Sequence, residues 1–160
     1  MAIGIRPAPT ADLPALGRLG ALLVRAHHDF DARRFIPANA ETEGGYSWFL
    51  GTQLEKPEIC VLVAEDESEI TGYVYAGLEG RDYMSLRGPA GVLYDVVVDP
   101  THRKHGVGRT LVETALAFLK SRGATQVVLS TATQNAAAQH LFERVGFRRT
   151  MVEMTAELTD

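Results

Sequence analysis

The chain has 160 residues, of which 46% are hydrophobic and 22% are charged, with a formal net charge of −4. This length predicts a single domain, residues 1–160, that can bury a sizeable core. The acidic balance argues against a broad nucleic-acid-binding surface, and no segment approaches the ~20 apolar residues that a membrane span needs. The single cysteine, Cys60, rules out an intramolecular disulfide and fits a reducing compartment. Because Met1–Pro7 also lacks the apolar run of a signal peptide, we expect a cytoplasmic protein without a nucleic-acid or membrane partner.

The first half of the chain predicts a strand, two helices and a hairpin. A short strand over 3–6 is closed by Pro7, and Thr10 is the predicted N-cap of a helix that carries Pro14 in its first turn. Apolar residues follow at helical spacing as far as His27, and the period is then lost until residue 40. A second helix is expected over 41–54. Residues 58–64 and 70–78 are rich in β-formers and flank a polar turn, which predicts an antiparallel hairpin.

The second half alternates strands and helices. A connection over 79–91 leads to a strongly apolar strand over 92–98, which ends at Asp99-Pro100. A helix over 106–121 stops at Gly123, a strand follows over 125–131, and a helix over 135–145 stops at Gly146. A final strand is expected over 151–158. The order β-α-α-β-β-β-α-β-α-β predicts an α/β fold whose mixed sheet has helices on both faces.

The clearest functional signal lies where the apolar strand passes into the helix over 106–121. A helix N-terminus presents unpaired N–H groups and the positive end of the helix dipole, so it attracts anions. Gly106 and Gly108 remove side chains that would keep a phosphate away, and the basic side chains there are Arg103, Lys104 and Arg109. A Walker loop would need Gly-Lys-Ser/Thr, and a dinucleotide site would need a third glycine where Leu111 stands. Taken alone, the pattern is equally consistent with a helix that merely begins with two glycines.

Two motifs together indicate a family. Residues 96–108 (VVVDPTHRKHGVG) resemble motif A of the GNAT N-acetyltransferase superfamily. Residues 129–135, followed by Ala138, Leu141, Phe142, Gly146 and Phe147, resemble its motif B. The resemblance implies a mostly antiparallel central sheet of the acyl-CoA N-acyltransferase type. It also implies acetyl-CoA as the cofactor and direct attack of a primary amine within a ternary complex.

The resemblance further implies where acetyl-CoA lies. The central strand splays from the next strand, and a bulge frees backbone groups that pair with pantetheine. One N–H near Val97 or Val98 would polarise the thioester carbonyl. The implied cofactor-binding residues are Val96, Val97, Val98, Arg103, Lys104, His105, Gly106, Val107, Gly108, Arg109, Thr110, Asn135, Ala138 and Phe142.

Asp95 is the candidate catalytic base. An attacking amine must lose its proton, and Asp95 is the only charge within the apolar strand over 92–98. A structural carboxylate that accepts hydrogen bonds is the equal alternative. Phe142 stands where many relatives of this superfamily have a tyrosine that protonates the leaving thiolate. Coenzyme A then leaves as thiolate, or Tyr94 donates the proton, or the protein is a non-catalytic acetyl-CoA-binding or sensing module.

The acceptor site is predicted less sharply than the cofactor site. The resemblance implies that the first two helices and the loop before the central strand shape it. The candidates for binding a small-molecule or peptide amine are His28, Phe30, Arg33, Arg34, Tyr75, Tyr94 and Asp95. Arg33 or Arg34 would pair with an acceptor carboxylate. Adjacent histidines on a helix point about 100° apart, so no metal site is expected at His27-His28. The acceptor's identity, the acyl-chain specificity and a homodimer through a sheet edge or the C-terminal strand all stay open.

Overall fold

The computed structural model describes residues 3–103 and 105–159. Within these residues, five strands form one sheet in the order β1-β2-β3-β4-β5. The first four strands are antiparallel neighbours, and β5 runs parallel to β4. This arrangement confirms the predicted mixed, mostly antiparallel sheet. The strands are β1 (Gly4–Pro7), β2 (Ile59–Asp66), β3 (Glu69–Glu79), β4 (Ala90–Val98) and β5 (Val127–Leu129).

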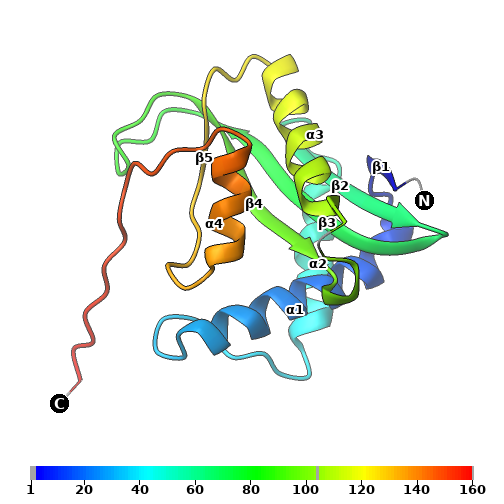
Figure 1. Cartoon of the computed structure of the whole chain (residues 1–160), viewed down its shortest axis with the longest axis horizontal. Coiled ribbons are helices and arrows are strands. Elements are labelled where there is room, and N and C mark those ends of the chain that lie inside the picture. Colours follow the sequence, from blue (N-terminus) through cyan, green and yellow to red (C-terminus); the bar gives the residue numbers. More distant parts are fainter. Residues whose placement is uncertain (1–2, 104, 160) are drawn as a thin grey trace.

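Helices cover both faces of the sheet, as predicted (Figure 1). On one face, α1 (Leu13–Phe30) and α2 (Thr42–Gln53) pack with Leu16, Leu19 and Leu50 against the sheet. On the other face, α3 (Val107–Ser121) buries Leu111 and Leu119, and α4 (Ala136–Arg144) buries Phe142. Two 3₁₀ turns, Thr10–Asp12 and Pro100–His102, precede α1 and α3. The sheet thus separates two cores, each with its own pair of helices.

The limits of α1 differ from the sequence prediction at both ends. Thr10 begins a 3₁₀ turn without capping the helix, and α1 itself starts at Leu13 with Pro14 in its first turn. The helix continues past His27 to Phe30, and the Asp31 N–H bonds the His27 carbonyl oxygen at 3.1 Å. Apolar residues at helical spacing mark only the face of a helix that is buried. The spacing can therefore end several residues before the last backbone hydrogen bond of the helix. The last turn of α1 therefore carries His27 and His28 into the region of the site.

Two glycines of α1 let α2 approach closely. A Cβ atom on Gly17 would lie 2.4 Å from the Glu43 carbonyl oxygen, and one on Gly20 would lie 2.3 Å from the Tyr46 ring. Contacts this short do not occur between real atoms, so alanine at either position would force the helices apart. The close approach holds Tyr46 of α2 over the sheet, where it reaches β4.

Strand β4 contains a bulge and then separates from β5. Tyr75 of β3 pairs with Asp95, and Ala76 pairs with Leu93, so Tyr94 is the extra residue. Such a bulge re-aims the side chains that follow it. Leu93 consequently faces the α3–α4 core, whereas Val97 faces the α1–α2 core. The β5 pairing covers only residues 91–93 of β4, and β5 is shorter than the strand predicted over 125–131.

The strand predicted over 151–158 is wrong. These residues form no strand in the part of the chain that the structure describes, and their side chains are exposed. After α4, the chain runs away from the body as an extended segment, red in Figure 1. The composition is typical of a strand, but a strand also needs a neighbour with free N–H and C=O groups. Among the residues that the structure describes, no strand pairs with residues 151–158.

Candidate functional site

A cavity of about 110 Å³ lies where β4 and β5 separate. Its walls come from α1 on one face of the sheet, from the two strands, and from α4 on the other face. The lining residues are Leu23, His27, Leu93, Tyr94, Asp95, Val96, Leu129, Ser130, Thr131, Asn135, Ala138 and Phe142. The gap in the sheet therefore connects its two faces, so groups that enter from opposite sides can meet within it.

Asp95 is in this cavity, as the sequence predicted, and two tyrosines hold its carboxylate. The Tyr46 hydroxyl donates a hydrogen bond to Asp95 Oδ2 at 2.6 Å, and the Tyr73 hydroxyl donates to the same oxygen at 3.0 Å. Burial raises the pKa of Asp95 above its ordinary value, and the two tyrosine hydrogen bonds oppose that rise. The sequence did not indicate this pairing, because Tyr46 and Tyr73 come from different elements that only the tertiary fold brings together.

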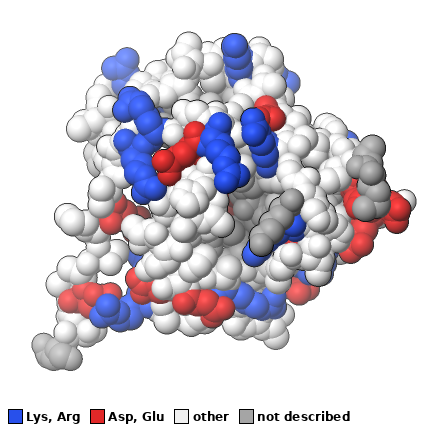
Figure 2. All heavy atoms as spheres, in the orientation of Figure 1, with Lys and Arg blue, Asp and Glu red and all other residues white. Residues whose placement is uncertain are grey.

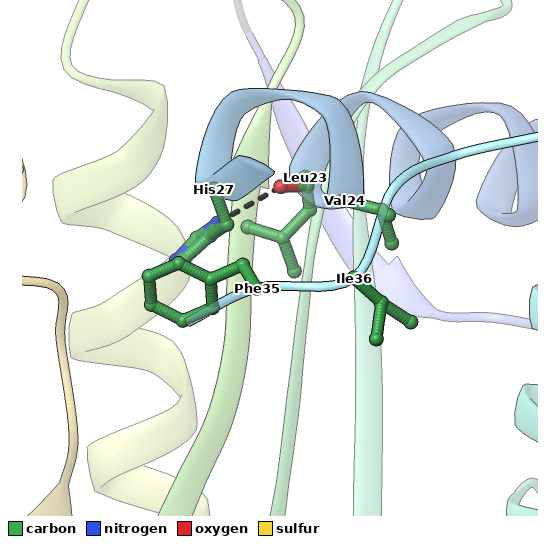
Figure 3. A pocket seen from close by; sticks show the side chains of 5 residues that line it. All are labelled: Leu23, Val24, His27, Phe35 and Ile36. Atoms are coloured by element: carbon green, nitrogen blue, oxygen red, sulfur yellow. Dashed lines mark hydrogen bonds between the residues drawn. The ribbon is translucent and has the colours of Figure 1, made fainter. Parts of the chain in front are cut away.

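His27 also lines this cavity, although it was not among the predicted acceptor residues. Its Nδ1 lies 2.8 Å from the Leu23 carbonyl oxygen (Figure 3). A carbonyl oxygen only accepts, so Nδ1 carries the hydrogen and Nε2 of the neutral ring is left as an acceptor. The ring also packs edge-on against Phe30 and Phe35, with centroids 5.7 and 5.0 Å away. These contacts fix the imidazole at the wall of the cavity that contains Asp95.

A second, apolar hollow adjoins the first cavity at His27. It has a volume of about 170 Å³ and is lined by Leu23, Val24, His27, Phe35 and Ile36 (Figure 3). Leu23 and His27 also line the cavity between β4 and β5. A molecule that reaches Asp95 past His27 would therefore have an apolar surface beside it.

The predicted phosphate site is a helix N-terminus built around a glycine. Gly106 precedes α3 with φ of 77°, a left-handed conformation that favours glycine. Val107 is buried in the α3–α4 core and anchors the first turn of the helix there. The Thr110 hydroxyl donates to the Gly106 carbonyl oxygen at 2.9 Å. Lys104 lies outside the described residues. The geometry fits an anion held mainly by backbone N–H groups.

The basic side chains near this helix start are not all free. Arg103 donates from Nε to the Val98 carbonyl oxygen at 3.2 Å, and Arg109 forms an ion pair with Glu113 at 2.7 Å. Over the half of the molecule that α3 and α4 form, Lys and Arg side chains gather (Figure 2). His105 is exposed. The positive character of this face therefore arises from several groups together with the helix start.

Comparison with known proteins decides the family. The Acetyltransferase (GNAT) family matches residues 23–147, which include the cavity, the helix start and both motifs. The chain belongs to this family.

The GNAT relatives differ in length and in what their names describe. A mycothiol acetyltransferase from Thermobispora bispora is 41% identical over 58% of this chain and 31% of its own length. Human N-acetyltransferase 8 is 35% identical over 57% of this chain and 39% of its own length. The chain thus spans about a third of the curated relatives' length.

Solved structures with this fold match nearly the whole chain. A mutant of the BH1408 protein from Bacillus halodurans has a TM-score of 0.84 with 23% identity, covering 98% of this chain and 99% of that one. Aminoglycoside N-acetyltransferase AAC(6')-Iy in complex with CoA has a TM-score of 0.75 with 16% identity, covering 98% and 94%. At these identities the likeness establishes the GNAT fold.

The residues predicted for the pantetheine side of this GNAT fold divide into two groups. Val96, Asn135, Ala138 and Phe142 line the cavity. Asn135 also caps α4, because its Oδ1 accepts the Ala138 N–H at 3.1 Å. By contrast, the Val97 side chain is buried in the α1–α2 core, and Val98 packs against the α3–α4 core. A contact from these two residues to a ligand in the cavity would have to come from their backbone.

The hydroxyl groups of both predicted tyrosines, Tyr75 and Tyr94, donate hydrogen bonds to other side chains. Tyr94 lines the cavity and stacks on Tyr75 with ring centroids 4.6 Å apart. Its hydroxyl donates to Glu79, and burial followed by this hydrogen bond raises its pKa. Tyr75 is buried and donates to Gln53 Oε1 at 3.1 Å. Tyr75 thus supports the ring of Tyr94 instead of lining the cavity itself.

Four of the predicted acceptor residues, two in the last turn of α1 and two in the loop after it, line neither of the two cavities. His28 Nδ1 is 3.0 Å from the Phe35 carbonyl oxygen, and Phe30 contacts the His27 ring. Arg34 donates two hydrogen bonds to the Glu153 carboxylate, and Arg33 lies 3.9 Å from Glu157. These four side chains thus support the loop or hold the C-terminal segment, and the structure does not bring them together around one ligand.

Across 3–103 and 105–159, no cluster of three His, Cys, Asp or Glu side chains is placed to hold a metal ion. In the same residues, no helix has the length and apolar character to cross a membrane. Cys60 is buried in β2, and burial raises the pKa of its thiol to about 11.

Proposed function

We propose that this chain is an N-acetyltransferase that moves the acetyl group of acetyl-CoA to a primary amine within a ternary complex. The observation that carries the proposal is the cavity between β4 and β5, which is lined by Ala138 and Phe142 of α4 on one face of the sheet and reaches Asp95 and His27 toward the α1 face. A donor that enters from one face and an acceptor that enters from the other would meet there without a covalent enzyme intermediate. Proximity of this kind is a large part of what an enzyme contributes.

The donor side fits acetyl-CoA. The N-terminus of α3 and the left-handed Gly106 form a backbone cradle for the pyrophosphate. Beyond Leu93, β4 has left its β5 neighbour, so its N–H and C=O groups on that side can pair with an extended pantetheine arm. Val96, Asn135, Ala138 and Phe142 would border that arm. Acetyl-CoA supplies an activated thioester carbonyl, which these residues position.

The acceptor side offers two groups to an amine. Asp95 presents a carboxylate whose Oδ2 is held by two tyrosines, so its Oδ1 is the oxygen available to a ligand. A raised pKa brings this carboxylate closer to the pH at which a general base works best. We assign the amine proton to Asp95. His27 Nε2 accepts a second amine hydrogen bond and orients the nitrogen lone pair.

Coenzyme A, the leaving group, can depart without a proton from a side chain of this protein. Phe142 has no hydroxyl to donate, and the Tyr94 hydroxyl already donates to Glu79. A tyrosine with a raised pKa is also a poorer acid than a free one. A free thiol has a pKa of about 8.5, so coenzyme A can depart as a thiolate.

The apolar hollow indicates which small-molecule or peptide amines would fit best as the acceptor. Its volume of about 170 Å³ is close to that of an engineered cavity of about 150 Å³ that binds benzene. The acceptor we propose therefore has a compact apolar group near its amine. Release of thiol from acetyl-CoA, measured across amines with apolar, polar and cationic substituents, tests both parts of the proposal. Binding of acetyl-CoA without thiol release for any amine would favour the alternative, a non-catalytic binding or sensing module.

His27→Phe is expected to lower kcat/KM for the amine about tenfold, the effect of one lost hydrogen bond of about 1.4 kcal/mol. Phenylalanine keeps the edge-on packing against Phe30 and Phe35 but has no ring nitrogen. His28→Phe is the matched control, because His28 is adjacent and bonds a backbone carbonyl but lies outside the cavity. Steady-state kinetics of both variants, with thermal unfolding as a check on folding, measure the difference. An equal loss of kcat/KM in the two variants would show that His27 has no role in the reaction.

A further inference from the structure

Two tyrosine hydroxyls stabilise the buried carboxylate of Asp95 from different layers of the fold. Tyr46 comes from α2 and Tyr73 from β3, and both donate to Oδ2, at 2.6 and 3.0 Å. A hydrogen bond to an ionised acceptor is stronger than one to a neutral acceptor. The two contacts therefore favour the carboxylate, whereas burial favours the protonated acid.

Neither tyrosine can itself replace Asp95 as a base. The Tyr73 side chain is fully buried, and Tyr46 is half-buried. Burial, followed by the negative charge of Asp95, raises the pKa of both hydroxyl groups. Each hydroxyl thus keeps its proton near neutral pH and remains a donor. Asp95 is consequently the member of this group of three that changes its charge.

The position of the Tyr46 hydroxyl depends on how α2 packs on α1. A Cβ atom on Gly20 of α1 would lie 2.3 Å from the Tyr46 ring, so the ring lies directly against the α1 backbone. The next residue, Ser47, donates from its hydroxyl to the Leu13 carbonyl oxygen at 2.6 Å. Tyr73, by contrast, is held within the sheet, between β2 and β4. The carboxylate is therefore fixed by one donor from a helix and one from a strand.

The other titratable groups around Asp95 act on it less strongly. His27 of α1, when it is protonated, lowers the pKa of Asp95 through its charge, but by less than either donor does. Tyr75 of β3 and Tyr94 of β4 direct their hydroxyl groups to other side chains. On the β5 and α4 side of the cavity, the lining residues among those described are apolar or carry neutral hydroxyl and amide groups. The two donors are therefore the main opposition to the effect of burial.

We propose that Tyr46 and Tyr73 are positioning residues for amine acetylation that act through Asp95, by keeping its carboxylate ionised and by leaving Oδ1 for the acceptor. A base that is already protonated cannot take the amine proton. Because the α1–α2 contact at Gly20 places Tyr46, the packing of these two helices controls the base from outside the cavity. This inference rests on the proposed function, in which Asp95 is the base.

NMR of the side-chain carboxyl carbon of Asp95, in the full chain without a ligand, tests the inference independently of activity. The resonance is assigned by its loss in Asp95→Asn. Tyr46→Phe and Tyr73→Phe are each expected to raise its titration midpoint by about one pH unit, the scale of one hydrogen bond to a charged group. Tyr75→Phe is the matched control, because this hydroxyl lies on the same face of β3 but bonds Gln53. Midpoints no higher in the first two variants than in the control would overturn the inference.

Gly20→Ala tests the contribution of the helix contact without removing any of the three polar groups. The added methyl group displaces the Tyr46 ring, so the midpoint of Asp95 is expected to rise in this variant too. Gly44→Ala is the control within α2, since an added Cβ there has no atom within 4 Å. An unchanged midpoint in Gly20→Ala, with a raised one in Tyr46→Phe, would overturn the role of the α1–α2 contact.

The pH dependence of kcat separates failure of this inference from failure of the proposed function. Since kcat reports groups in the enzyme–substrate complex, its acid limb is expected to move upward in Tyr46→Phe together with the NMR midpoint. A midpoint that moves while the limb stays in place would contradict Asp95 as the base but support the effect of the tyrosines on its charge. A midpoint that does not move would overturn the inference whatever the rate of acetylation.

Discussion

Asp95→Asn is expected to lower kcat/KM for amine acetylation by at least a hundredfold, the usual scale for removing a positioned general base. Asparagine retains an oxygen that can accept the Tyr46 and Tyr73 hydroxyls, but it has no negative charge and does not take up a proton near neutral pH. Binding of acetyl-CoA is expected to stay within about twofold, because the substitution lies on the acceptor side. Steady-state kinetics and calorimetric titration with acetyl-CoA measure the two effects separately.

The same substitution is expected to leave the protein at least as stable as the wild type at pH 7. Burial raises the pKa of Asp95, so the folded state binds its proton more tightly than the unfolded state. This contribution to folding is present at low pH and is lost as the pH rises through the folded-state pKa. At pH 7 the wild type carries the cost of a buried charge, which asparagine removes. A midpoint of thermal unfolding well below that of the wild type would show that the carboxylate is structural.

Asp29→Asn is the control for Asp95→Asn. Asp29 is exposed in the last turn of α1, near the same end of the molecule. Its replacement makes an identical change in net charge, and we expect turnover within about twofold of the wild type because screening weakens exposed charges. Comparable activity in Asp95→Asn and Asp29→Asn would exclude Asp95 as the base.

Gly106→Val is the second substitution with a large expected effect. A β-branched residue is a true outlier at a φ of 77°, so the loop before α3 must change its conformation. The N–H groups at the helix start then no longer converge on one anion. We expect the dissociation constant for acetyl-CoA to rise at least tenfold, which corresponds to about 1.4 kcal/mol.

Gly80→Val separates this effect from a general loss of stability. Gly80 lies in the loop between β3 and β4, has no atom within 4 Å of an added Cβ, and has no positive φ. Titration calorimetry with acetyl-CoA on both variants gives the comparison. If Gly106→Val bound acetyl-CoA as tightly as Gly80→Val, the phosphate cradle would lie elsewhere.

The elements of the fold were predictable where a local pattern determines them. The hairpin of β2 and β3, the apolar β4 and the helices α3 and α4 follow from spacing, turns and glycine stops, and the structure confirms them. The C-terminal end of α1 was not predicted because a helix can continue beyond the last residue of its buried apolar face. The strand over 151–158 was wrong for a different reason: alternation specifies a strand's faces but does not supply its neighbour.

The site was predictable in part. Asp95 was predicted because it is the only charge in the apolar strand over 92–98, and the cavity residues Ala138 and Phe142 of α4 were predicted from a motif that is continuous in sequence. The roles of Tyr46, Tyr73 and His27 were not predicted, because the contacts that give each of them a role come from the packing of α1 and α2 onto β3 and β4. The ion pairs of Arg33 and Arg34 with the C-terminal segment were also beyond the sequence, since 124 and 119 positions separate Arg33 from Glu157 and Arg34 from Glu153.

The proposed reaction requires the cavity between β4 and β5 to bring a thioester and an amine together. The most direct test mixes the purified chain with acetyl-CoA and one amine at a time, and follows free thiol and acetylated amine in the same sample. We expect one thiol for each acetylated amine, with a rate that depends on both reactants and is highest for amines with a compact apolar group. Tight binding of acetyl-CoA with no amine-dependent thiol across the whole series would contradict it.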